Sequence, residues 1–98
     1  MKITKNLNGT ALEIVLEGRL DTVSAPDLEK ELNDSLEGAT ELTLDLAKLD
    51  YISSAGLRVL LSAHKAMSKK DGMKVKNANE IVREVFDVTG FSDILTIE

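Results

Sequence analysis

The sequence contains no cysteine and no tryptophan, and it has only one proline and three aromatic residues. Without cysteine, the chain can form neither a disulfide framework nor a thiolate metal site. Three aromatic side chains give few platforms for base stacking, and a formal net charge of −5 leaves no dense basic patch. Direct binding to nucleic acid is therefore not expected.

Long apolar runs are absent as well. No segment approaches the roughly 20 apolar residues that cross a bilayer, so we expect no direct membrane insertion, although a membrane-bound partner is compatible with the sequence. Residues 1–7 lack the apolar core of a signal peptide. The expected location is the cytoplasm.

The composition is otherwise close to that of an average globular protein, with 43% hydrophobic and 30% charged residues. There is no internal repeat, low-complexity run or linker-like segment. Because 98 residues have room for one small core, we expect a single domain over residues 1–98.

Periodicity predicts alternating strands and helices in the order β-β-α-β-α-β-α-β. Gly18 is expected to end the second strand, and Ser24 to cap the first helix with Asp27 bonding back. Asn77 or Asn79 is expected to cap the third helix. Strands are expected at 3–7, 11–17, 42–46, 73–76 and 94–97, and helices at 24–38, 54–68 and 79–90.

Three of these strands carry a polar residue at every second position, whereas a sheet covered on both faces has nearly continuous apolar strands. The predicted fold class is α/β, with a single-layer, mixed, mostly parallel sheet and the helices on one face. Right-handed crossovers then add each parallel strand at the same edge, so that sequential strands become neighbours. The other face of the sheet stays in contact with water.

Residues 49–57, Leu-Asp-Tyr-Ile-Ser-Ser-Ala-Gly-Leu, place two hydroxyl groups where a strand gives way to a helix. The unpaired N–H groups and dipole of a helix N-terminus stabilise a phosphate. We interpret Ser54 as a phosphorylation switch, and the alternative is a simple helix cap. Asp21 follows the neighbouring strand and should lie close to Ser54, either as part of a partner surface or only in an Asx turn.

Three motifs resemble those of a known family: Gly-Arg-Leu-Asp at 18–21, Tyr-Ile-Ser-Ser-Ala-Gly-Leu at 51–57, and Phe-Asp-Val-Thr-Gly-Phe at 86–91. They are similar to motifs of the STAS domains of anti-sigma factor antagonists, and the similarity covers nearly the whole chain. The segment order also matches the one-sided βα superhelix of this family.

The resemblance implies a partner-switching protein. When unphosphorylated, it binds an anti-sigma factor with serine kinase activity and so frees the sigma factor; when phosphorylated, it lets go until a serine phosphatase resets it. The family pattern Asp-Ser-Ser/Thr-Gly places the modified serine on Ser54, with Ser53 in place of the aspartate and as a minor alternative acceptor. The expected partner-binding residues are Asp21, Thr22, Ser53, Ser54, Ala55, Gly56 and Arg58.

No feature of the sequence indicates an enzyme or a cofactor. His64, the only histidine, lies ten residues beyond Ser54, roughly 15 Å along the expected helix, so it cannot activate that hydroxyl. Phosphate-binding loops, nucleophile elbows and metal-ligand spacings are missing. The rival function is a STAS subunit that docks on a membrane lipid transporter ATPase complex or a signalling scaffold.

Overall fold

One five-stranded sheet organises the chain, and the computed structural model describes all residues from Met1 to Glu98. The strands follow one another across the sheet in sequence order. The first pair is antiparallel and the other three pairs are parallel, as predicted. The strands are β1 (Lys2–Asn8), β2 (Ala11–Leu20), β3 (Glu41–Ile52), β4 (Met73–Lys76) and β5 (Thr96–Ile97).

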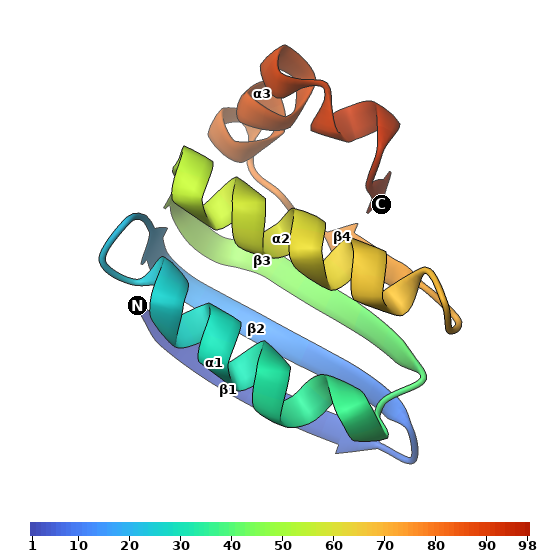
Figure 1. Cartoon of the computed structure of the whole chain (residues 1–98). Helices are drawn as coiled ribbons and strands as arrows, with labels where there is room; N and C mark the ends of the chain where they lie inside the picture. The colour runs from blue at the N-terminus through green and yellow to red at the C-terminus, as the bar shows by residue number, and fades with distance from the viewer.

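Three α-helices connect the parallel strands, and two 3-10 turns follow the first and third of them. The helices are α1 (Ala25–Ser35), α2 (Ser54–Met67) and α3 (Glu80–Thr89), and the 3-10 turns are η1 (Leu36–Gly38) and η2 (Phe91–Asp93). Figure 1 shows α1 and α2 side by side across one face of the sheet, with α3 beyond them at the β4 side. This arrangement confirms the predicted fold class.

The core lies between the sheet and these helices and contains 23 buried hydrophobic residues. Phe86 and Val82 of α3 belong to it together with leucines from the inner face of the sheet. The opposite face carries charged pairs, such as Lys76 Nζ and Glu13 Oε2 at 3.0 Å. No helix has the length and apolarity needed to cross a membrane.

Both central strands run further than their alternation predicts. The expectation that Gly18 ends the second strand is wrong, because its positive φ of 102° falls beside a register shift and β2 continues to Leu20. In β3, the pairing register shifts twice relative to β2, and the buried positions become Leu46, Leu49 and Ile52. Two bulges in β3 therefore change the spacing of its buried residues from every second to every third position.

Asn79, and not Asn77, caps α3. Its Oδ1 accepts a hydrogen bond from the backbone N–H of Val82 at 2.9 Å, and its Nδ2 donates to the carbonyl of Leu49 at 2.9 Å. β4 pairs only as far as Asp45 of β3, so the carbonyl of Leu49 has no β4 partner. The residue that caps α3 thus also supplies a hydrogen-bond donor to a carbonyl in the part of β3 that extends beyond β4.

Candidate functional site

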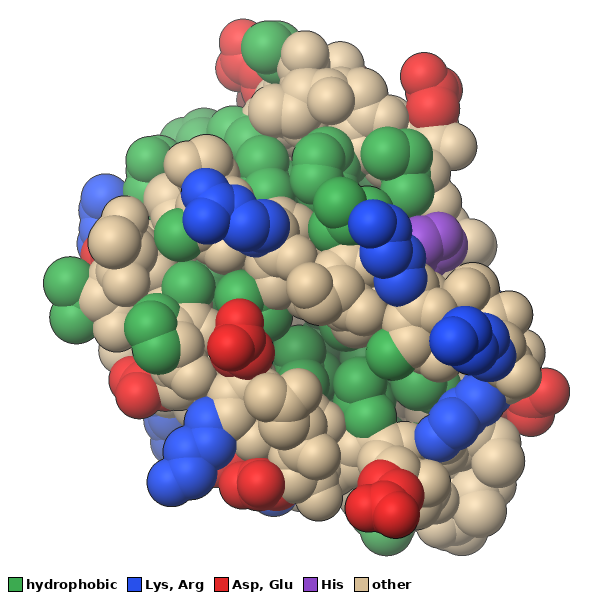
Figure 2. Space-filling model, in the orientation of Figure 1, with side chains coloured by type: hydrophobic (Ala, Val, Ile, Leu, Met, Phe, Trp, Pro, Cys, Tyr) green, Lys and Arg blue, Asp and Glu red, His purple; other side chains and the backbone are tan.

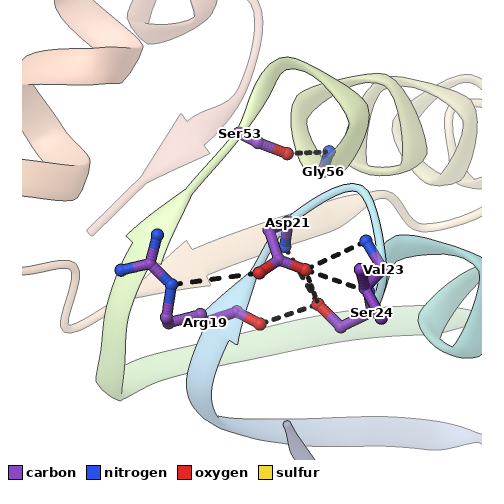
Figure 3. Close-up of polar contacts among 6 residues, drawn as sticks. All are labelled: Arg19, Asp21, Val23, Ser24, Ser53 and Gly56. Atoms are coloured by element: carbon purple, nitrogen blue, oxygen red, sulfur yellow. Dashed lines mark hydrogen bonds and ion pairs between the residues drawn. The ribbon is translucent and has the colours of Figure 1, made fainter.

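The C-terminal ends of β2 and β3 bring two chain segments together. Leu20 pairs with Ile52 in the parallel ladder, and the N–H of Ser53 donates to the carbonyl of Leu20 at 2.8 Å. The chain then turns into α1 after β2 and into α2 after β3 (Figure 3). The β2–α1 turn and the start of α2 therefore form one surface, as the strand order predicts.

Asp21 holds the turn after β2 in the way an N-cap residue holds a helix. Its Oδ1 accepts hydrogen bonds from the backbone N–H groups of Val23 at 3.0 Å and Ser24 at 3.1 Å. Its carbonyl accepts the α-helical bond from the N–H of Ala25 at 2.8 Å. α1 thus has an additional first turn, and Pro26 interrupts it because proline has no N–H to donate.

The expected capping role of Ser24 is wrong. Ser24 has helical backbone angles and its side chain forms no cap hydrogen bond to the helix. Instead, its buried hydroxyl donates to the carbonyl of Arg19 at 2.7 Å and accepts from the N–H of Asp21 at 2.9 Å. Ser24 therefore ties the turn back to the end of β2 (Figure 3).

These hydrogen bonds keep the Asp21 carboxylate charged. The N–H of Ser24 is the largest reason that the pKa of Asp21 lies below its ordinary value of 3.8. Burial opposes this shift as the second-largest effect, and the Ser24 hydroxyl, the Val23 N–H and the Arg19 guanidinium each lower the pKa further. Arg19 is itself held, with its Nε 3.9 Å from Asp21 Oδ2 and its guanidinium carbon 4.4 Å from the centre of the Tyr51 ring.

At the start of α2, the two serines have different environments. Ser53 is the N-cap, because its backbone is extended and its Oγ accepts a hydrogen bond from the N–H of Gly56 at 3.3 Å. Ser54 is the first helical residue and is exposed, and its hydroxyl makes no hydrogen bond within the chain. The alternative interpretation of Ser54 as the helix cap is therefore wrong.

Gly56 allows α2 to approach the strands closely. A Cβ atom at this position would lie 2.7 Å from Cγ of Leu20 and 2.9 Å from Cγ1 of Ile52. Both neighbours are buried at the ends of β2 and β3. The absence of a side chain at Gly56 thus positions Ser54 directly beside the strand ends.

A groove between α1 and α2 continues this surface. It has a volume of about 210 Å³, and three of the expected partner-binding residues, Thr22, Ala55 and Arg58, line it. Glu29 of α1 lines the other side. Figure 2 shows hydrophobic atoms in the floor between the two helices and charged side chains along its margins. The groove joins both helices to the turn at Asp21.

Val23 is part of this surface and is not among the residues expected from the sequence. The residue is 84% exposed, although valine is apolar, and its N–H is fixed by Asp21. The signal in the sequence is a single apolar residue between polar ones in the turn, Asp-Thr-Val-Ser. An apolar side chain displayed on a rigid turn is suited to contact another protein.

The fold and the site define a small, single-sheet α/β domain whose β2–α1 turn and α2 N-terminus form one continuous surface at the strand ends. The model of the family described as the STAS domain matches residues 2–98. The chain therefore belongs to the STAS domain family, and within it to the group of the anti-sigma factor antagonists.

Relatives and solved structures agree with this assignment. BtrV of Bordetella bronchiseptica, assigned to the anti-sigma factor antagonists, is 38% identical over 99% of this chain and 85% of its own. The anti-sigma-B factor antagonist of Bacillus subtilis is 32% identical over 92% of this chain and 84% of its own. The unphosphorylated form of the anti-sigma factor antagonist SpoIIAA shares the fold, with a TM-score of 0.85 and 17% identity. The match covers 99% of this chain and 88% of the SpoIIAA chain. SpoIIAA is also solved in a phosphorylated form, with a TM-score of 0.77, 16% identity and coverage of 99% and 91%.

Proposed function

We propose that this chain, acting as one STAS domain over residues 1–98, is an anti-sigma factor antagonist switched by phosphorylation of Ser54. Unphosphorylated, it binds an anti-sigma factor that is also a serine kinase, and the bound sigma factor is set free. Phosphorylated, it releases the kinase. The observation that carries the proposal is the exposed, unbonded hydroxyl of Ser54 at the first position of α2.

The switch consists of two group transfers. In the first, Ser54 Oγ attacks the γ-phosphorus of ATP in the kinase, the bond to the β-phosphate oxygen breaks, and ADP leaves. The hydroxyl proton passes to a base of the kinase. In the second, water attacks the phosphorus in a serine phosphatase, Oγ regains a proton, and inorganic phosphate leaves. The chain serves as substrate in both steps.

Ser54 can accept a phosphate without losing any bond inside the chain. The helix cap belongs to Ser53, and the N–H groups of the first turn of α2 lie next to the new charge. The cost falls on the partner interface. A phosphate adds about −1.5 to −2 charges next to the Asp21 turn, whose carboxylate is also negative, and a partner fitted to a neutral hydroxyl is repelled.

The same proposal assigns no catalytic activity, cofactor or metal to the chain itself. His64 Nδ1 is buried without a hydrogen-bond partner, and His64 follows Ser54 by ten residues along α2, about 15 Å. It therefore cannot act as a base for Ser54. The proposed location is the cytoplasm, and the chain acts on transcription through a protein partner without contacting DNA.

The test combines phosphate mapping with binding. Wild type, Ser54→Ala and the control Ser62→Ala, a serine further along the same helix, are incubated with ATP and lysate of the source organism. Intact-mass spectrometry should show one phosphate on wild type and on Ser62→Ala, and none on Ser54→Ala. Ser53→Ala tests the minor alternative acceptor, because this variant should still gain the phosphate if Ser54 is the acceptor and should not gain it if Ser53 is.

Binding to the co-purified partner gives the second readout. We expect Ser54→Ala to stay folded and bind constitutively, and Ser54→Asp to bind less well. Equal affinities for the wild-type, alanine and aspartate forms would contradict the switch. Co-purification of an ATPase or a permease, in place of a kinase-type regulator, would instead support the transporter-docking function.

A further inference from the structure

Two arginines belong to the segments that meet at the strand ends, Arg19 in β2 and Arg58 in α2, and they differ in what they already contact. The guanidinium of Arg19 stacks on Tyr51 at 4.4 Å, with its Nε 3.9 Å from the Asp21 carboxylate. Arg58 is exposed and forms no ion pair and no hydrogen bond through its side chain. Glu29 lines the same groove as Arg58, yet the two side chains do not form an ion pair. Arg58 is therefore the uncommitted cation of this surface.

Helix geometry places Arg58 next to Ser54. The two residues are four positions apart in α2, which is about 6 Å along the axis on the same face. An anion N-terminal to a cation at this spacing is the favourable orientation. The first turn of α2 contains no acidic residue, whereas the first turns of α1 and α3 contain Asp27 and Glu80. No intrahelical carboxylate competes for Arg58.

We propose that Arg58 is the intramolecular counter-ion of the phosphate on Ser54. This inference rests on the proposed phosphorylation of Ser54. The planar guanidinium pairs with two phosphate oxygens, a geometry that lysine does not provide. Phosphorylation then changes the surface at the strand ends in two ways at once, because it adds negative charge at Ser54 and also withdraws the Arg58 cation from the groove offered to the partner.

The test measures the phosphate directly and needs no partner. Phosphoserine is incorporated at position 54 during translation, and its ³¹P chemical shift is followed against pH in wild type, Arg58→Gln and Lys65→Gln. Lys65 is the matched control, because it is an exposed, unpaired cation on nearly the same face of α2 but about 16 Å from Ser54. Arg19, Asp21 and Glu29, the charged groups that face the site from the neighbouring elements, are the same in all three proteins.

A phosphoserine ordinarily has its second pKa near about 6. We expect this pKa to be lower in wild type than in Arg58→Gln by about 0.2–0.4 pH units, the size of a helical pair at this spacing. Lys65→Gln should keep the wild-type value, and Arg58→Lys should fall between wild type and Arg58→Gln.

Equal phosphate pKa values in wild type and Arg58→Gln would overturn the inference. Equal shifts in Arg58→Gln and Lys65→Gln would also overturn it, because they would reflect only net charge. Since translation supplies the phosphate, neither result depends on a kinase. The proposed function fails separately, if lysate does not modify Ser54 or if partner binding ignores the modification.

Discussion

Replacing Gly56 with alanine adds one methyl group at the tightest contact between α2 and the strands. The new Cβ would lie 2.7 and 3.0 Å from Cγ and Cδ2 of Leu20, and 2.9 Å from Cγ1 of Ile52. Favourable carbon–carbon contacts are about 3.5–4.0 Å, so these atoms must move apart. Leu20 and Ile52 are buried in the core and cannot turn into solvent. The helix itself must shift outward.

Two opposing effects set the change in stability. Overpacking a core position costs typically about 1–3 kcal/mol, and contacts below 3.0 Å place Gly56→Ala in the upper part of this range. Alanine recovers about 1 kcal/mol through its higher helix propensity. We therefore expect a net loss of about 1–2 kcal/mol in the free energy of unfolding. For a domain of this size, each kcal/mol lowers Tm by about 4–8 °C.

Gly38→Ala is the matched control for urea and thermal unfolding. Gly38 lies in η1, a Cβ added to it would meet no atom within 4 Å, and its φ is not positive. Losing glycine flexibility in the unfolded state should stabilise this variant by about 0.4–1 kcal/mol. If Gly56→Ala unfolds at the same urea concentration as Gly38→Ala, the close-packing argument is refuted.

Three further predictions concern the caps and the charges. Ser53→Ala should lower the free energy of unfolding by about 0.5–1 kcal/mol, because it removes the cap of α2. Ser54→Ala should change it by less than about 0.5 kcal/mol. Equal losses in urea unfolding would contradict the conclusion that Ser53, and not Ser54, is the cap. Asn79→Ala should cost about 1–3 kcal/mol, because it removes the α3 cap and leaves the Leu49 carbonyl without its donor; a Tm within about 2–3 °C of wild type would argue against this. The free energy of unfolding should fall as the pH drops below about 4, because Asp21 and Asp45 have folded-state pKa values below their ordinary values, so the stabilisation present above the unfolded pKa is lost on protonation. For Asp45, burial acts to raise the pKa, but hydrogen bonds from the Ala47 N–H and the Asn77 side chain, together with the nearby Lys76 and Lys48, lower it. The double variant Asp21→Asn, Asp45→Asn should lose less Tm on acidification than wild type, and an equal loss would exclude these two groups as its cause.

The sheet could be predicted from the sequence because its pattern is local. Polar residues at alternate positions, such as Glu13, Thr43 and Lys74, require one face in water, and this requirement leaves only a one-sided arrangement of helices. The strand order then follows from the handedness of the crossovers. Both inferences use neighbouring residues and general geometry, without any knowledge of contacts between distant parts of the chain.

The strand ends could not be predicted, because they depend on pairing between strands. Gly18 has the positive φ that a turn residue would have, but Arg19 and Leu20 continue the ladder opposite Tyr51 and Ile52. The bulges in β3 also remove the alternation by which a strand is recognised. A periodic pattern alone cannot distinguish a bulged strand from a strand that has ended.

The sequence pattern predicts the cap of α1 at the wrong residue for a related reason. Ser24 followed by Pro26 and Asp27 has the composition of a helix start, and Asp21 three residues earlier has it equally. In the structure, Asp21 accepts the N–H bonds and Ser24 is already inside the first turn. The missing N–H of Pro26 interrupts the hydrogen-bond ladder, so the turn before it cannot be recognised from sequence alone.

In the proposed switch, the two serines at the start of α2 separate stability from regulation. If Ser54 were the cap, phosphorylation would change the group that holds the first turn, and the switch would alter the fold as well as the surface. In the structure, Ser53 holds the turn and the Ser54 hydroxyl is free. Serine and aspartate are both good N-caps, so Ser53 in place of the aspartate of the family pattern preserves this division. The substitution also removes a carboxylate next to the proposed phosphate position, so that α2 itself offers no acidic side chain to compete with the phosphate for Arg58.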